Sequence, residues 1–240
     1  MRSKKVTIVT VTYNCVDLLE GTIKSILSQT FNDYEYIIID GGSTDGTIDV
    51  INKYKTKLSF WCSEKDNGIF DAMNKGINHA NGEWINFMNA GDFFYDENVL
   101  DLVFSDNNTE SFSFIYGDNV VINGEQTIYK KANPFYKSKK IHRRMGFNHQ
   151  SVFVKTNLAK KNQFDLNFKI AADYNMINKI YKSGGRPLYI NSPLSITNLN
   201  GISAKNRNRQ LYEEEIISNA NKNIRYRFYK FLKAFKDKIW

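Results

Sequence analysis

The 240-residue sequence has few cysteines and prolines and no long apolar run. Its 2 cysteines, Cys15 and Cys62, exclude a disulfide-stabilised scaffold and a zinc ribbon, and they agree with a reducing compartment. The 3 prolines and 14 glycines exclude collagen-like and low-complexity chains. No segment approaches the roughly 18 consecutive apolar residues of a transmembrane helix, and residues 1–5 lead into a strand-like run without a signal-peptide cleavage pattern. The sequence therefore predicts a globular protein on the cytoplasmic side of the membrane.

The charge is moderately basic, with 33 Lys and Arg against 25 Asp and Glu and a formal net charge of +8. Such an excess is compatible with a nucleic-acid partner, but no helix-turn-helix, RNP or zinc-finger pattern is present. The basic residues gather in the segment 137–144 and near the C-terminus. We therefore expect a polyphosphate or a membrane surface, and no nucleic acid, as the acidic partner.

The first hundred residues alternate apolar strand-like runs with amphipathic helical segments. The run VTIVTVT (6–12) is typical of a strand buried on both faces of a parallel sheet. We expect strands at 6–12, 34–40, 58–63 and 84–89, and helices at 16–29, around 48–51 and at 69–81. This alternation predicts a parallel, right-handed, doubly wound sheet.

Polar residues follow each of these strands, and the carboxyl ends of parallel strands are where such sheets bind ligands. These residues are Thr12, Tyr13, Asn14, Asp40, Glu64, Asp66, Asn89 and Asp92. Their ordinary role is to form turns and to cap helices. Their number and placement also fit a crevice for a nucleotide diphosphate, in which Asp92 is the obvious carboxylate for a divalent cation.

Beyond Glu97 the pattern changes to α+β, with a short helix at 100–104 and antiparallel strands at 114–121 and 127–131. A basic surface loop at 133–148, a strand at 151–154, a helix at 171–183 and a short strand at 188–190 are expected to follow. Residues 212–240 read as helix, and the last part has one apolar and one basic face. Binding to an anionic membrane and packing on the chain's own core explain that pattern equally well.

Four segments together resemble the family 2 inverting glycosyltransferases of the GT-A fold, especially the bacterial enzymes that build O-antigen, capsule or exopolysaccharide. They are VTIVTVTYN, DGGSTDGT (40–47), EKDNGIFDAMNKGINHANGEW (64–84) and INFMNAGD, which ends at Asp92. The resemblance implies an α/β fold whose Rossmann-like, mainly parallel half (1–96) binds the nucleotide sugar. An α+β half (97–210) would bind the acceptor and supply the catalytic base, and a basic amphipathic helix (211–240) would follow.

The resemblance also implies roles for individual residues. Asp173 matches the acidic catalytic base, for which Asp165 is the nearest rival, and Asp92 matches the ligand of Mn²⁺ or Mg²⁺. His149 and Gln150 match a polar pair near the acceptor, and the segment 198–203 resembles a loop that closes over the site. The residues matched to the nucleotide sugar are Thr12, Tyr13, Asn14, Asp40, Asp66, Asn74, Lys75, Asn89 and Gly91.

The metal motif departs from the family pattern, because the segment Asn89-Ala90-Gly91-Asp92 keeps a single carboxylate where the family has two or three. Mg²⁺ commonly uses few protein ligands beside phosphate oxygens, so one carboxylate suffices for a weakly held cation. Metal independence stays an alternative.

The predicted function is transfer of a hexose from a nucleotide sugar, expected to be a UDP-sugar, to a lipid-linked saccharide in bacterial surface polysaccharide synthesis. The protein would lie peripherally at the inner face of the plasma membrane, and a homodimer is an assembly that we consider for it. A catalytically silent nucleotide-sugar or saccharide-binding protein is the alternative that the incomplete metal motif suggests. A pyrophosphorylase and a dinucleotide oxidoreductase are disfavoured, because the turn after the first strand, TVTYNC, contains no glycine.

Overall fold

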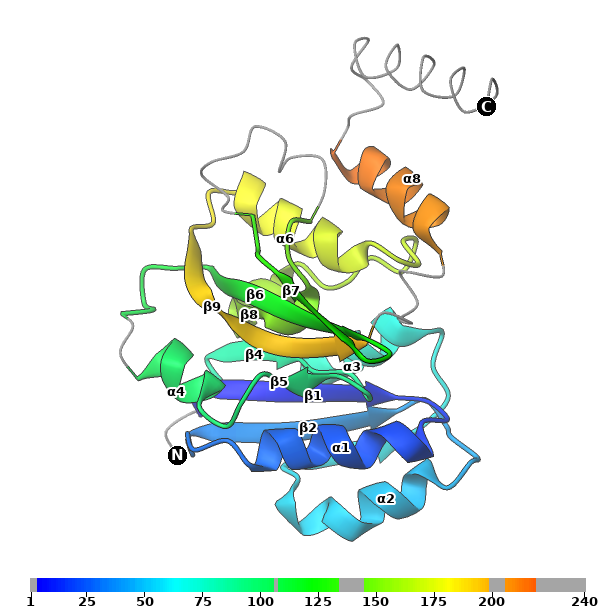
Figure 1. Cartoon of the computed structure of the whole chain (residues 1–240). Coiled ribbons are helices and arrows are strands. Elements are labelled where there is room, and N and C mark those ends of the chain that lie inside the picture. Colours follow the sequence, from blue (N-terminus) through cyan, green and yellow to red (C-terminus); the bar gives the residue numbers. More distant parts are fainter. Residues whose placement is uncertain (1–3, 106–107, 134–144, 199–205, 219–240) are drawn as a thin grey trace.

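One mixed sheet runs through the molecule in the computed structural model, which describes residues 4–105, 108–133, 145–198 and 206–218. The strand order is β3 (Phe60–Ser63), β2 (Tyr34–Asp40), β1 (Val6–Thr12), β4 (Trp84–Phe87), β8 (Val152–Lys155), β6 (Phe114–Asn123), β9 (Pro187–Asn198) and β5 (Phe93–Phe94), and β7 (Gln126–Lys130) pairs with β6. In Figure 1 the helices α1 and α2 lie on one side of this sheet, and α6 lies at its opposite end. The predicted α/β fold with a mainly parallel first half is confirmed.

The parallel part consists of β1 (Val6–Thr12), β2 (Tyr34–Asp40), β3 (Phe60–Ser63) and β4 (Trp84–Phe87). Every residue of β1 is buried, because alternate side chains face two different layers. Ile8 packs with the residues of α1 (Val16–Leu27), whereas Val9 packs with those of α3 (Ile69–His79). A strand covered on both sides reads as a continuous apolar run, which is why the sequence located it.

Helix α2 (Thr47–Tyr54) and the short 3-10 turn Lys55–Lys57 connect β2 to β3. Because β1 pairs in parallel with both β2 and β4, their carboxyl ends open at the same edge of the sheet. The turns after Thr12, Asp40 and Phe87 therefore lie next to one another. That common edge positions the site.

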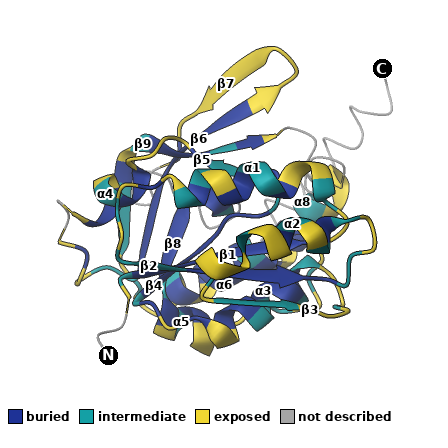
Figure 2. Ribbon diagram, turned by 90° about the horizontal axis from the view of Figure 1, so that it is seen from below, coloured by how far each residue is buried: buried dark blue, intermediate teal, exposed yellow. Residues whose placement is uncertain are grey.

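The second half extends the same sheet with antiparallel pairs. Strand β8 (Val152–Lys155) pairs with β4, and β6 (Phe114–Asn123) pairs with β8 and with β7 (Gln126–Lys130). Helices α4 (Val99–Phe104), α5 (Thr156–Lys161) and α6 (Ala172–Lys182) pack beside these strands. The short 3-10 turn His149–Ser151 leads into β8. Figure 2 shows the hairpin β6–β7 projecting from the molecule, and all residues of β7 are exposed.

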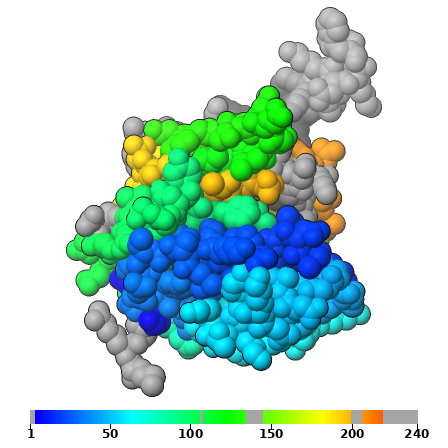
Figure 3. Space-filling model, turned by 60° about the horizontal axis from the view of Figure 1, so that its bottom comes forward, coloured from blue at the N-terminus to red at the C-terminus, as the bar shows by residue number. Residues whose placement is uncertain are grey.

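Strand β9 (Pro187–Asn198) is much longer than the short strand expected at 188–190. It runs parallel to β6, and the register shifts at Gly117 and Asp118, so Ile190 and Pro193 oppose successive residues of β6. The irregularity accommodates Pro193, which has no N–H to donate. The far end of β9 pairs with β5 (Phe93–Phe94), which directly follows Asp92. Figure 3 shows the blue and cyan surface of the first half adjoining the green surface of the second.

Helix α8 (Arg207–Ser218) begins earlier than the helix predicted at 212–240 and crosses the expected boundary at residue 210. Residues 219–240, on which the expected amphipathic face depends, lie outside the described part, as does most of the predicted basic loop. Within the described residues, α5 is a short helix that the pattern did not indicate. Among the described helices, none is both long and apolar enough to cross a membrane.

Candidate active site

A cavity of about 1200 Å³ lies at the carboxyl edge of the parallel strands and extends between the two halves of the chain. Nine of the residues predicted for the site line it: Thr12, Tyr13, Asp66, Asn89, Gly91, Asp92, His149, Gln150 and Asp173. Residues matched to donor, cation, acceptor and base roles therefore share one cavity. The other four, Asn14, Asp40, Asn74 and Lys75, are not among its lining residues.

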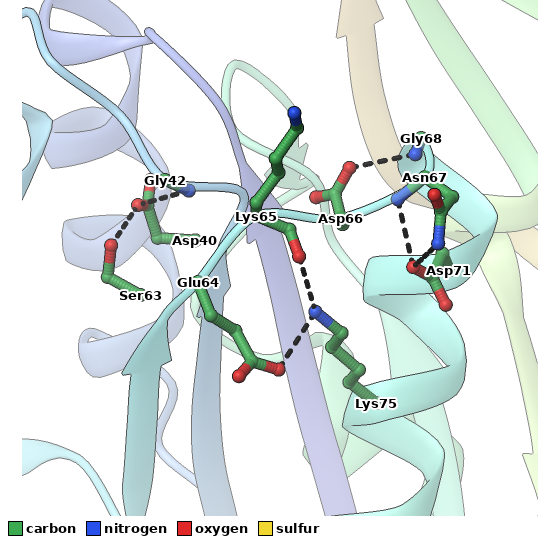
Figure 4. A network of polar contacts seen from close by, with 10 residues as sticks. All are labelled: Asp40, Gly42, Ser63, Glu64, Lys65, Asp66, Asn67, Gly68, Asp71 and Lys75. Carbon is green, nitrogen blue, oxygen red and sulfur yellow. Dashed lines mark hydrogen bonds and ion pairs between the residues drawn. The ribbon is translucent and has the colours of Figure 1, made fainter.

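Asp40 shapes the turn beside the cavity. Its carboxylate is fully buried, and Oδ2 accepts the N–H groups of Gly42 and Ser43 at 3.0 and 2.9 Å and the Ser63 hydroxyl at 2.7 Å. Figure 4 shows Asp40 between Gly42 and Ser63. These three donors occupy Oδ2, while the Ser43 hydroxyl also bonds Oδ1. The carboxylate thus holds the turn after β2 in place.

Asn14 joins the turn after β1 to the turn after β2. Its N–H donates to Ser43 Oγ at 2.7 Å, and its Oδ1 accepts the N–H of Thr44 at 2.9 Å. Asn14 has a positive φ of 49°, a conformation that asparagine tolerates better than most residues. Next to this pair of turns, Asp66 Oδ1 accepts the N–H of Gly68 at 2.8 Å (Figure 4).

Asn74 and Lys75, the polar pair on α3, form hydrogen bonds and an ion pair with residues that do not line the cavity. Lys75 Nζ lies 2.8 Å from Glu64 and donates to the carbonyl of Lys65 at 3.1 Å, as Figure 4 shows. Asn74 donates to the Phe164 carbonyl and accepts the Phe164 N–H, both at 2.9 Å. The amide of Asn74 therefore fastens α3 to the second half rather than facing the cavity.

Asp92 is the carboxylate at the end of the turn after β4. Burial raises its pKa to about 6, although a 2.7 Å hydrogen bond from Gln150 Nε2 and the nearby His149 act in the opposite direction. Thr22 of α1 shapes the turn, because its hydroxyl donates to the Asp92 carbonyl at 2.9 Å and accepts the Gly91 N–H at 2.9 Å. Thr22 was not predicted, since a threonine on the buried face of a helix carries no distinctive sequence signal.

The oxygen atoms near Asp92 fit a divalent cation that is shared with a ligand. Asn89 is 8% exposed, and its Oδ1 has no hydrogen-bond partner among the described residues. In the same part of the chain, no group of three or more His, Cys, Asp or Glu side chains is placed to hold a metal. Mg²⁺ and Mn²⁺ accept oxygen ligands and keep several positions for phosphate and water. Asp92 would therefore hold such a cation, with the remaining positions filled by diphosphate oxygens and water.

His149 connects the two sides of the cavity. Its Nδ1 lies 3.4 Å from Asp173 Oδ2, and its Nε2 lies 3.1 Å from Asn89 Nδ2. When the Asn89 amide nitrogen donates to Nε2, the proton of the neutral ring lies on Nδ1, the nitrogen nearer Asp173. Asp173 sits in the first turn of α6, and its Oδ1 accepts the N–H of Tyr174 at 2.7 Å. One carboxylate oxygen thus faces the histidine.

The wall of the cavity that α8 and the end of β7 form includes residues that the sequence analysis did not indicate. Helix α8 contributes Arg207, Gln210 and Glu214, and the end of β7 contributes Lys130 with its neighbour Lys131. The segment RNRQLYEEE was not singled out, because its polar composition gives a weak helical pattern without an apolar stripe. Charged and amide groups on this wall suit a hydroxyl-rich ligand.

The chain is similar to known proteins in both sequence and structure. The family model for glycosyl transferase family 2 matches residues 7–165. A PGL/p-HBAD biosynthesis glycosyltransferase of Mycobacterium bovis is 28% identical over 179 residues, which cover 72% of this chain and 68% of that protein. An uncharacterized glycosyltransferase of Mycobacterium tuberculosis is 31% identical over 177 residues, which cover 72% and 67% of the two chains.

Solved structures show the same fold. A fragment of S. aureus TarS in complex with UDP has a TM-score of 0.68 at 18% identity, and the match covers 88% of this chain and 70% of that one. A longer TarS chain is matched over 36% of its length. The mannosyltransferase PcManGT of Pyrobaculum calidifontis, in complex with GDP-Man and Mn²⁺, has a TM-score of 0.67 at 19% identity, and the match covers 90% and 65%. With its family model, its fold and its cavity in agreement, the chain belongs to glycosyl transferase family 2.

Proposed function

We propose that the protein is an inverting glycosyltransferase that moves a hexose from a UDP-sugar to a hydroxyl of a lipid-linked saccharide. The observation that carries the proposal is the placement of two carboxylates, Asp92 and Asp173, in one cavity. Two consecutive residues contact them, since Gln150 donates to Asp92 at 2.7 Å and His149 faces Asp173 at 3.4 Å. The two carboxylates would have different roles, since Asp92 would bind the cation and Asp173 would accept the proton.

The donor would lie against the turns of the parallel half. Thr12 and Tyr13 line the cavity there, and Thr12 Oγ1 is buried without a hydrogen-bond partner among the described residues. A buried hydroxyl of this kind is ready to bond a nucleotide. Nucleotide-sugar use is supported by family membership, and the choice of UDP by the TarS fragments solved with UDP and UDP-GlcNAc.

The reaction would be a single displacement. Asp173 takes the proton of the acceptor hydroxyl while the acceptor oxygen forms a bond to the anomeric carbon. The bond from that carbon to the diphosphate breaks on the opposite face, and the nucleoside diphosphate leaves with its electron pair. His149 orients Asp173 through its Nδ1 proton. When bound at Asp92, Mg²⁺ or Mn²⁺ supplies charge that neutralises the diphosphate. Attack opposite to the leaving group inverts the configuration, so an α-linked donor gives a β linkage.

The acceptor would occupy the wall formed by α6 and α8. Arg207, Gln210 and Glu214 offer both donors and acceptors to sugar hydroxyls, and Lys130 and Lys131 suit an anionic pyrophosphate. The C-terminal sequence, which would place basic residues on one face of a helix and apolar residues on the other, agrees with peripheral binding at the inner leaflet and a role in surface polysaccharide synthesis. Removal of residues 219–240 should abolish sedimentation with vesicles that contain anionic lipid, whereas nucleotide binding should persist.

Calorimetric binding of UDP, GDP, CDP and dTDP, each with and without Mn²⁺, tests the donor assignment. We expect UDP to bind most tightly, with an affinity that falls when Mn²⁺ is omitted or when Asp92 is replaced by alanine. Absence of binding for all four nucleotides would contradict the assignment. For the chemical step, Asp173→Asn should lower UDP release from UDP-sugars by about 100-fold or more while UDP binding persists.

The alternative is a catalytically silent binding protein, which the single carboxylate of the metal motif suggests. Such a protein binds UDP but has no turnover for Asp173→Asn to remove. Tight UDP binding combined with no transfer to any saccharide acceptor would favour this alternative.

A further inference from the structure

Helix α8 presents a buried carboxylate to the backbone in front of α6, and Figure 1 shows α8 in orange beside α6 in yellow. Glu213 is 4% exposed. Its Oε1 accepts the N–H of Lys169 at 3.0 Å, and its Oε2 accepts the N–H groups of Ile170 and Ala171 at 2.9 and 3.0 Å. A single side chain thus binds three consecutive N–H groups.

These three N–H groups lie in the segment that leads into α6, the helix that carries Asp173. The last of them belongs to Ala171, the N-cap residue of α6, which has no side-chain oxygen of its own. Ile170 and Ala171 are buried, so their N–H groups depend on an acceptor within the protein. Glu213 supplies that acceptor from a distant part of the chain, and its charge lies favourably near the positive end of the helix dipole.

The charge of Glu213 is compensated locally. Arg209 Nε, one turn earlier on α8, donates to Oε1 at 2.9 Å. Burial raises the pKa of Glu213, but the hydrogen bonds from the Lys169 N–H, Arg209, and the N–H groups of Ile170 and Ala171 outweigh it and hold the pKa below its ordinary value. The ionised carboxylate is therefore the form that accepts these bonds.

We infer that Glu213 is a positioning residue that fixes the N-terminal turn of α6 and thereby the direction of Asp173 toward the acceptor. The inference rests on the proposed function, in which Asp173 accepts the acceptor proton. Asp173 is the second residue after Ala171, so a shift of the segment 169–171 moves its Cα directly. Displacements of about 1 Å at a reacting group lower rates by as much as about 100-fold. Helix α8, which carries Glu213, also lines the acceptor wall through Gln210 and Glu214.

The test compares Glu213→Gln with a matched substitution, Glu35→Gln, at the opposite edge of the sheet. Glutamine at 213 replaces one acceptor oxygen by an NH₂ group, which cannot accept a backbone N–H. Glu35 also binds two backbone N–H groups, those of Asn81 and Gly82, together with the Thr7 hydroxyl. All three contacts of Glu35 are made by Oε1, so glutamine at 35 can keep them with its amide oxygen. Both variants therefore lose one carboxylate charge, but only glutamine at 213 must also give up a backbone N–H contact.

Two readouts are needed. In amide hydrogen exchange, Glu213→Gln should speed the exchange of residues 169–171 by about tenfold or more, whereas Glu35→Gln should leave it unchanged. In UDP release from UDP-glucose, UDP-galactose or UDP-GlcNAc, whichever is turned over, Glu213→Gln should lower kcat by about 10- to 100-fold. The donor KM should stay within about twofold, because Glu213 bonds the segment 169–171 and Arg209 rather than the donor turns. If Glu213→Gln does not bind UDP, Glu213→Asp replaces it in both measurements.

The outcomes separate this inference from the proposed function. Unchanged exchange at 169–171 in Glu213→Gln overturns the inference whatever the activity, and so does faster exchange with wild-type kcat. The variant Asp173→Asn, measured in parallel, judges the base assignment alone. Wild-type turnover in Asp173→Asn would overturn the proposed base and, with it, the reason for positioning it, even if exchange shows that the Glu213 contacts hold the backbone.

Discussion

His149 Nδ1 lies 3.4 Å from Asp173 Oδ2, while the same ring accepts a hydrogen bond from Asn89 at 3.1 Å. The ring is held from both sides, so its proton faces the carboxylate. Asn89 lies in the turn that ends at Asp92, and His149 is followed by Gln150, which bonds Asp92. Asp92 and Asp173 are therefore linked through His149, Asn89 and Gln150 and the backbone that joins them, so we expect a change at one carboxylate to affect the other.

Replacement of His149 by phenylalanine should lower turnover and leave nucleotide binding intact. The substitution keeps a ring of similar shape but removes the Nδ1 proton that orients Asp173, and we expect kcat to fall by about 10- to 100-fold. UDP binding by calorimetry is the control, with an expected change of less than about twofold. An equal loss in kcat and in UDP affinity would show instead that His149 supports the whole cavity.

Replacement of Asp92 by asparagine should stabilise the nucleotide-free protein at neutral pH. The pKa of Asp92 is raised from 3.8 to about 6, so ionisation of this group costs stability as the pH rises through that interval, and the cost persists above it. Asparagine stays neutral and still accepts the bond from Gln150. The expected gain at pH 8 is on the order of 1 to 3 kcal/mol, and it shrinks toward pH 4.

Thermal unfolding at pH 4, 6 and 8 measures this difference. In the presence of UDP and Mn²⁺ at pH 8 the order should reverse, because both ligands bind the wild-type protein more tightly and therefore stabilise it more than the variant. A pH-independent difference between the two proteins would contradict the assignment of the raised pKa to Asp92.

Replacement of Gly41 by alanine should weaken nucleotide binding through Asp66. A Cβ at this position would lie 2.5 Å from Asp66 Oδ2 and 3.3 Å from Tyr13 Cδ2, so both side chains must shift. We expect a loss of UDP affinity of about tenfold, measured by calorimetry, since two cavity residues are displaced. In the background Asp66→Ala, where the nearest contact is gone, Gly41→Ala should cost much less, and an equal loss in both backgrounds would sink this explanation.

Replacement of Asn74 by alanine separates a structural role from a nucleotide-binding role. The Asn74 amide makes two 2.9 Å hydrogen bonds to the backbone of Phe164, so its loss should lower the free energy of unfolding by about 1 to 3 kcal/mol. Because Asn74 is not among the residues that line the cavity, UDP affinity should change by less than about twofold. Urea unfolding and calorimetry measure the two quantities. A large loss of UDP affinity in a stable variant would restore the nucleotide-binding role expected from the resemblance.

The parallel half could be predicted because its signals are local. Strands β1 and β2 are buried on both faces, so their apolar runs are continuous and end at polar turns. Strand β9 was only partly predicted, because its continuation beyond Ile190 depends on pairing with β6 across a register shift. Pairing between segments about 70 residues apart leaves no periodic mark in either segment.

The amino-acid sequence by itself determined the family, the presence of the parallel strands in the first half and nine of the residues that line the cavity. Tertiary structure decided which polar groups face that cavity and which hold the fold. Asn74 has the residue type of a binding site, but its amide contacts the backbone of Phe164, which only folding brings close. The same reason hid Glu213, because a glutamate in a polar helix binds the segment before α6 only when α8 packs beside it. Hydrogen bonds between distant segments are set by the fold, and residue type alone does not specify them.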